Sequence, residues 1–103
     1  MRQFDVIANP SARSRDEIPW LVVLQSHHLA AMPTVVAAPL LKYEPRAAYS
    51  ETSVVVSFKG EAFIVSVAEL AAIDARGLPP SSGDLRDAED SIRRALDRLF
   101  TGF

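Results

Sequence analysis

The chain has 103 residues, of which 49% are hydrophobic and 23% are charged, and its formal net charge is −2. This length and composition predict a single globular domain spanning residues 1–103 and argue against a disordered chain. The negative charge is unlike that of a general cationic nucleic-acid binder. Because the chain has no cysteine, disulfides, thiol nucleophiles and cysteine-based metal sites are excluded.

The chain shows no signal for membrane insertion or export. An apolar stretch from Val35 to Leu41 contains Pro39 and is far shorter than the about 20 residues that span a bilayer. Residues 1–5 lack the apolar segment of a signal peptide. We therefore expect a cytoplasmic protein with no membrane partner, whose function depends on a surface or a cleft.

Apolar residues in the first two-thirds of the chain follow the patterns of β-strands. The expected strands are residues 4–8, 20–24, 34–38 and 53–58, and we expect the third to end at Pro39. Between the first two, residues 9–19 predict a loop because they are rich in polar residues and contain Pro10. Residues 42–50 are compatible with a loop or with a short extra ribbon.

A hairpin is the clearest local signal in the sequence. Lys59-Gly60 separates two apolar runs, residues 53–58 and 61–67, and glycine readily adopts the positive φ of a tight turn. Residues 68–75 fit either a short helical turn or another strand. Residues 77–83, rich in Gly, Pro and Ser, predict a linker within the domain.

The end of the chain predicts an amphipathic helix of about four turns. Asp84 is the expected N-cap, and Gly102 is the expected left-handed C-cap. Apolar residues recur along it at helical spacing and form one stripe: Leu85, Ala88, Ile92, Leu96 and Leu99. The other side alternates arginine with aspartate, which indicates a solvated face rather than a nucleic-acid-binding stripe.

The sequence contains no recognisable catalytic motif. His27 and His28 are the only histidines, and adjacent side chains point apart on a strand or a helix, so the two are poorly placed to share a metal. No glycine-rich phosphate loop and no nucleophile motif is present. We therefore expect no catalytic residue, no metal and no cofactor.

Two aromatic residues close the chain. Phe100 either continues the apolar stripe of the helix, with Phe103 covering its end, or the tip of the helix docks on another chain. The sequence leaves these alternatives open.

The order and spacing of several short segments resemble those of the CcdB toxins of toxin–antitoxin modules. The resemblance covers nearly the whole chain, although no single segment is a strong motif. Its best segments are Gln3-Phe4-Asp5-Val6, Leu24-Gln25-Ser26, Pro39-Leu40, Ala88 to Leu96, and the ending Leu99-Phe100-Thr101-Gly102-Phe103.

This resemblance implies a fold and a function. The expected fold is mainly β with a C-terminal α-helix, a small SH3-like antiparallel barrel of the CcdB/MazF-like type. The expected protein is a homodimer and not an enzyme. It would insert its C-terminal tips into the DNA gyrase A subunit, a type II topoisomerase, trap the complex with cleaved DNA, and be neutralised by a small CcdA-like antitoxin.

The resemblance also assigns residues to partners. Toward gyrase it places Gln3, Phe4, Ser26, His28, Leu29, Asp97, Thr101, Gly102 and Phe103. Toward the antitoxin it places Phe58, Glu61 and Phe63. The family has a tryptophan where this chain has Thr101, and threonine offers much less apolar area than the indole ring. We therefore predict weak gyrase poisoning, or none, and stronger gyrase binding by Thr101→Trp.

Two alternatives to gyrase poisoning remain. The same barrel and helix occur in endoribonuclease toxins of the MazF type, which use arginine with a hydroxyl or a carboxylate near a dimer groove. The acidic net charge of this chain is unfavourable for that function. The other alternative is a CcdB-fold protein that no longer poisons gyrase.

Overall fold

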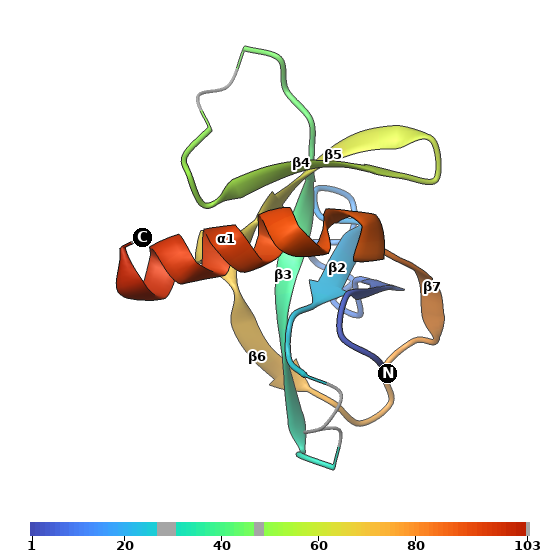
Figure 1. Ribbon diagram of the computed structural model, residues 1–103. Coiled ribbons are helices and arrows are strands. Elements are labelled where there is room, and N and C mark those ends of the chain that lie inside the picture. Colours follow the sequence, from blue (N-terminus) through green and yellow to red (C-terminus); the bar gives the residue numbers. More distant parts are fainter. Residues whose placement is uncertain (27–30, 47–48, 103) are drawn as a thin grey trace.

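The computed structural model describes residues 1–26, 31–46 and 49–102, and in these the chain forms a curled antiparallel sheet with one helix laid across it (Figure 1). The strands are β1 (Asp5–Ala8), β2 (Trp20–Val23), β3 (Thr34–Lys42), β4 (Ser53–Phe58), β5 (Glu61–Ser66), β6 (Ala71–Asp74) and β7 (Ser81–Asp84). Two 3-10 helices are η2 (Val67–Glu69) and η3 (Arg86–Ala88), and the α-helix is α1 (Glu89–Thr101).

The strand order in the sheet is β4-β5-β3-β2-β1-β7, and β6 pairs with β3 beside this path. Every pairing is antiparallel. The long strand β3 pairs with β2 on one side, and on the other side with β6 through its first half and β5 through its second. This exchange of partners along β3 curls the sheet. The predicted fold, a small SH3-like antiparallel barrel that is mainly β with a C-terminal helix, is confirmed.

The main core lies between one face of the sheet and α1. Ile92 and Ala95 of the helix are buried in it, and Leu96 and Leu99 pack against its margin. The predicted apolar stripe is confirmed for the part that lies on α1, with Ala95 as an addition. Leu85 and Ala88 also reach the core, but they precede the helix. Several strands also bury the opposite face, to which the alternate residues Ile7, Val23, Val35, Ala37 and Ile64 point.

The hairpin is confirmed in detail. Phe58 pairs with Glu61, and the two residues between them, Lys59 and Gly60, have φ of 51° and 77°. Positive φ at both positions is the geometry of a type I′ turn, whose twist matches that of the two strands. The hairpin is thus held by local backbone preference as well as by its buried side chains.

Strand β3 does not end at Pro39 as predicted, but continues to Lys42. Leu24 N–H donates to Val36 O, so these two residues form a hydrogen-bonded pair between β2 and β3. Hydrogen-bonded pairs alternate along an antiparallel ladder, so Pro39, three residues after Val36, falls in a pair that exchanges no hydrogen bonds with β2. The nitrogen of Pro39 points instead to the side where β6 has ended and β5 has not begun. A proline there removes no hydrogen bond of the sheet, which is why the strand tolerates it.

Two other predictions need correction. Part of the expected linker forms the edge strand β7, which pairs with β1 through a bulge. Asp84 does not cap the helix, because α1 begins at Glu89 after η3 and its N-cap residue is Ala88, without a side-chain hydrogen bond. Instead the Asp84 carboxylate accepts the N–H of Arg86 and forms an ion pair with its guanidinium at 2.9 Å. Gly102 is the left-handed C-cap, as predicted, with φ of 79°.

Candidate functional site

Helix α1 exposes two flanks on either side of its buried stripe. With 100° between successive residues, Arg93, Asp97 and Phe100 lie on one flank, and Ser91 with the other arginines of the helix lies on the opposite flank. We call the first the Gln3 flank, because Gln3 lies beside it, and the second the β4 flank, because it borders strand β4. Each carries a separate candidate site.

The Gln3 flank joins the N-terminal segment of the chain to the helix. The Gln3 side chain donates from Nε2 to Leu24 O at 2.9 Å, and its Oε1 accepts from Arg93 at 3.5 Å. The Arg93 guanidinium lies 5.5 Å from the centre of the Phe4 ring, a cation–π distance. Phe4 is 1% exposed and has a φ of 71°, which is strained for a residue with a side chain. In this backbone conformation the Phe4 ring lies in the core, and Gln3 is half-buried beside α1.

In the described part of the helix tip, which ends at Gly102, Phe100 is the one large exposed ring. The Thr101 hydroxyl donates to Asp97 O at 2.6 Å, and Gly102 N–H donates to Arg98 O at 3.1 Å. Phe100 is 70% exposed, so it does not continue the apolar stripe of the helix. The sequence could not separate this outcome from the alternative, because the last turn of the helix extends past the strands that it covers.

The structure brings most of the described residues of the predicted gyrase set to one side of the molecule. Gln3 lies beside Arg93, Asp97 follows one turn later, and Thr101 and Gly102 form the tip. Phe4 belongs to the same segment but is buried, and Ser26 is half-buried near the end of β2. His28, Leu29 and Phe103, together with His27, lie outside the described residues. Arg93 and Phe100 also lie on this flank but are not in the gyrase set that the resemblance implies, although the sequence left open that the tip with Phe100 docks on another chain.

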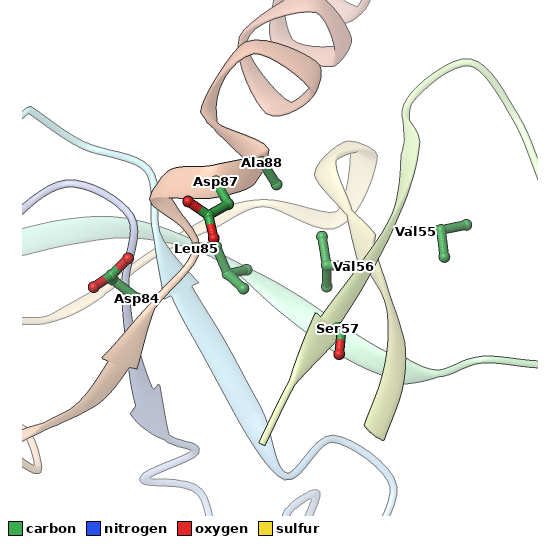
Figure 2. A pocket seen from close by; sticks show the side chains of 7 residues that line it. All are labelled: Val55, Val56, Ser57, Asp84, Leu85, Asp87 and Ala88. Atoms are coloured by element: carbon green, nitrogen blue, oxygen red, sulfur yellow. The ribbon is translucent and has the colours of Figure 1, made fainter. Parts of the chain in front are cut away.

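The β4 flank faces a groove along the outer edge of β4. A hollow of about 270 Å³ lies between β4 and the segment from Asp84 to Ala88 (Figure 2). Val56 points across it toward Leu85, while Val55 points away on the other side of the strand. A second hollow of about 250 Å³ continues past Val55, between the start of β4 and α1. Both hollows are lined in part by Val55 and follow one another along β4, and we call the two together the β4 groove.

The two ends of the β4 groove carry opposite charge. Asp84 and Asp87 line the first hollow, and the Asp87 carboxylate has no ion-pair partner among the described residues. The second hollow is lined by Arg94 and Arg98, together with the carboxylate of Glu51 and two serines. Neither arginine forms an ion pair within the described parts of the chain.

The predicted antitoxin set lies on the hairpin of β4 and β5, and two of its three side chains are buried. The rings of Phe58 and Phe63 are 6% and 2% exposed and belong to the core. Phe58 packs edge-on against Trp20, with 5.2 Å between ring centres. Of this set only Glu61, at the start of β5, is exposed. A partner that approaches this hairpin meets its outer residues rather than the two rings.

A smaller hollow of about 160 Å³ gathers arginines at the start of the helix. Its lining includes Arg2, Arg86, Glu89 and Arg93. Arg86 is paired with the carboxylates of Asp5 at 3.2 Å and Asp84, and Arg93 is paired with Glu89 at 3.2 Å. These carboxylates neutralise two of the three guanidinium groups.

Within residues 1–26, 31–46 and 49–102, no three His, Asp or Glu side chains gather as a metal centre requires. No helix in this described part of the chain is long and apolar enough to cross a bilayer.

Comparison with known proteins identifies the family. A family model described as "CcdB protein" matches residues 3–102. A solved structure entitled "Crystal structure of Mtb toxin" is similar, with a TM-score of 0.72 and 18% identity over 92% of this chain and 99% of that one. Another, "Endoribonuclease in complex with its cognate antitoxin from Mycobacterial species", gives a TM-score of 0.74 and 12% identity over 96% and 93% of the two chains. None of the curated proteins matches the sequence significantly.

Proposed function

The chain belongs to the CcdB family of toxins of toxin–antitoxin modules, and from this premise we propose that it inhibits DNA gyrase by protein–protein contact. In this proposal it acts in the cytoplasm as a homodimer, performs no catalysis and is neutralised by a small CcdA-like antitoxin. The observation that carries the proposal is the Gln3 flank. It aligns Gln3, Asp97 and the tip of α1 on one exposed surface, although the first of these is more than ninety positions away from the tip in the sequence.

The chemistry of the tip sets the expected strength of the contact. Thr101 stands where the family has a tryptophan, and its hydroxyl is turned back onto Asp97 O. Losing about 100 Å² of apolar contact at about 25 cal/mol/Å² weakens binding by about two orders of magnitude. Phe100 offsets part of this loss, because its ring is 70% exposed one position earlier. We therefore expect weak inhibition by the wild type, carried by Phe100.

The test is a supercoiling assay with purified gyrase. We expect Thr101→Trp to lower the inhibitory concentration by about tenfold or more, because it restores a large ring at the tip. Phe100→Ala should abolish the residual inhibition by the wild type. Deleting residues 101–103 retains Phe100, so it should weaken the residual inhibition without abolishing it, and it should leave the fold intact because the described part of this segment is exposed.

Val55→Ala is the matched control, since Val55 is also an exposed apolar residue, at 59%, but lies on β4 and away from the tip. Its inhibition should equal that of the wild type. Equal inhibition by the wild type, Thr101→Trp and Phe100→Ala would contradict the assignment of the tip as the gyrase contact. Absence of inhibition by the wild type and by all four variants would contradict gyrase as the target.

The homodimer is supported by apolar surface on the face of the sheet opposite α1. A hollow of about 260 Å³ there is lined mainly by apolar residues, including Ile18, Leu21, Pro39 and Ile73. A chain of this size buries its apolar surface incompletely, and contact with a second copy would cover more of it. Light scattering at tens of micromolar should report a dimer. A mass of 11.3 kDa, that of one chain, would contradict this part of the proposal.

RNA cleavage is a second candidate function. The arginine hollow beside Glu89 and the endoribonuclease among the similar structures favour it. Against it stand the carboxylates that already occupy Arg86 and Arg93. Incubation of the purified protein with RNA distinguishes the two functions. Gyrase inhibition without cleavage supports the first, whereas cleavage that is lost in Arg93→Ala but retained in Arg76→Ala supports the second.

A further inference from the structure

The outer edge of β4 leaves backbone hydrogen-bonding groups unpaired. Val67 N–H donates to Thr52 O at 3.1 Å, and the register places Thr52 opposite Val67. Because hydrogen-bonded pairs alternate along an antiparallel ladder, Val54 and Val56 exchange hydrogen bonds with β5, whereas Val55 and Ser57 do not. The N–H and C=O groups of Val55 and Ser57 therefore point away from β5, into the β4 groove. No backbone or side-chain partner within the described residues meets them.

This edge also lacks the usual protection against a further strand. Exposed edge strands are commonly blocked by proline, by charged residues or by a bulge. Residues 53–58 contain no proline and no charge, and they pair with β5 in an unbroken register. Val55, which is 59% exposed, lies at the centre of the edge. Such an edge is suited to receive a strand from a partner, with backbone hydrogen bonds providing the attachment.

The register predicts where the side chains of an added strand lie. All pairings in the sheet are antiparallel, so we take the added strand as antiparallel to β4, with its central residue opposite Val55. The residue before the centre is then opposite Val56, and its side chain enters the hollow lined by Asp87. The residue after the centre is opposite Val54, and its side chain enters the hollow lined by Arg94 and Arg98.

We propose that the β4 groove binds an extended segment of the antitoxin as an added antiparallel strand that reads basic, aliphatic, acidic from its N-terminus. The basic residue pairs with Asp87, and its aliphatic stem packs on Leu85. The aliphatic residue covers Val55. The acidic residue pairs with Arg94 and Arg98, whose two positive charges exceed the single negative charge of Glu51. The proposal rests on the proposed function, which supplies the antitoxin as the partner.

The test uses two synthetic peptides and the full-length protein. Each peptide is seven residues long and rich in Thr and Ser. One carries Lys-Val-Glu at its centre, and the other carries the reversed order, Glu-Val-Lys. Binding is followed by amide NMR signals, which detect weak complexes and report the site. We expect Lys-Val-Glu to shift the Val55 and Ser57 amides, slow their hydrogen exchange and bind about tenfold more tightly than the reversed peptide, since the charge pairs change from attractive to repulsive.

Charge reversal in the protein checks the orientation. Asp87→Lys combined with Arg94→Glu should reverse the peptide preference. Asp90→Lys is the control, because Asp90 is an exposed carboxylate of α1 that lines neither hollow, and it should keep the wild-type preference. Equal binding of the two peptides, preference for Glu-Val-Lys by the wild type, or shifts away from β4 would each overturn the proposal.

A second copy of the chain is the other possible occupant of the edge. If the Val55 and Ser57 amides are already protected from exchange in the free protein, and dilution to a monomer exposes them, the edge is a contact between copies and the proposal fails. The supercoiling assay tests the proposed function independently of this inference. Inhibition of gyrase together with an unoccupied β4 edge would refute this inference alone.

Discussion

Gly83→Ala tests the packing between the edge strand β7 and the core. Gly83 has a φ of 149°, and a Cβ atom added there would lie 2.8 Å from Cε1 and 3.3 Å from Cζ of Phe58. The backbone conformation costs a residue with a side chain about 1–3 kcal/mol, and overpacking adds about 1–3 kcal/mol. Phe58 cannot yield easily, because it packs edge-on against Trp20 in the core. We expect a loss of about 2–6 kcal/mol in the free energy of unfolding.

The matched control is Gly77→Ala. Gly77 has a φ of 71°, but an added Cβ would meet nothing within 4 Å, so the change costs only backbone strain, about 1 kcal/mol. Urea and thermal unfolding can be followed by the fluorescence of Trp20, the only tryptophan, which lies at the affected contact. The midpoint temperature of Gly83→Ala should lie about 10 °C below that of Gly77→Ala. Equal midpoints would refute the clash with Phe58.

A double variant separates the contact from the strain. Phe58→Leu shortens the side chain that faces Gly83, so it should recover part of the stability lost in Gly83→Ala. We expect a coupling free energy of about 1 kcal/mol or more between the two changes. Strictly additive losses would assign the whole effect to backbone strain.

Two further predictions concern the core and an exposed ion pair. Phe63→Ala should lower the free energy of unfolding by about 3–5 kcal/mol, because the ring is 2% exposed; weaker antitoxin binding with unchanged stability would contradict this assignment to the core. Arg76 donates to the Asp74 carboxylate from its guanidinium at 2.8 Å and from its backbone N–H, and these bonds lower the pKa of Asp74. The stabilisation that they give is present above the ordinary pKa of aspartate and is lost as the pH falls through the lowered pKa of Asp74. An NMR titration should find this lowered pKa, and Arg76→Ala should raise it; no change in that variant would contradict the pairing.

The elements whose geometry is local could be predicted from the amino-acid sequence. Lys59-Gly60 predicted the hairpin because a glycine between two apolar runs favours a two-residue turn with positive φ. The helix and its buried stripe followed from spacing, and Gly102 followed from the left-handed conformation that ends many helices. The family resemblance depended on the order of several such local segments, which is why it survived the errors at the element boundaries.

Tertiary structure decided what each element meets. β7 forms because β1 supplies its hydrogen bonds, although its segment has the composition of a linker. β3 continues past Pro39 because its partner changes there from β6 to β5. Phe100 and Phe63 are both phenylalanines in apolar segments, yet one is exposed past the end of the sheet and the other is buried inside it. The β4 groove exists because the sheet order leaves β4 at an edge beside α1. Strand order and helix placement are set by long-range pairing, which local periodicity does not encode.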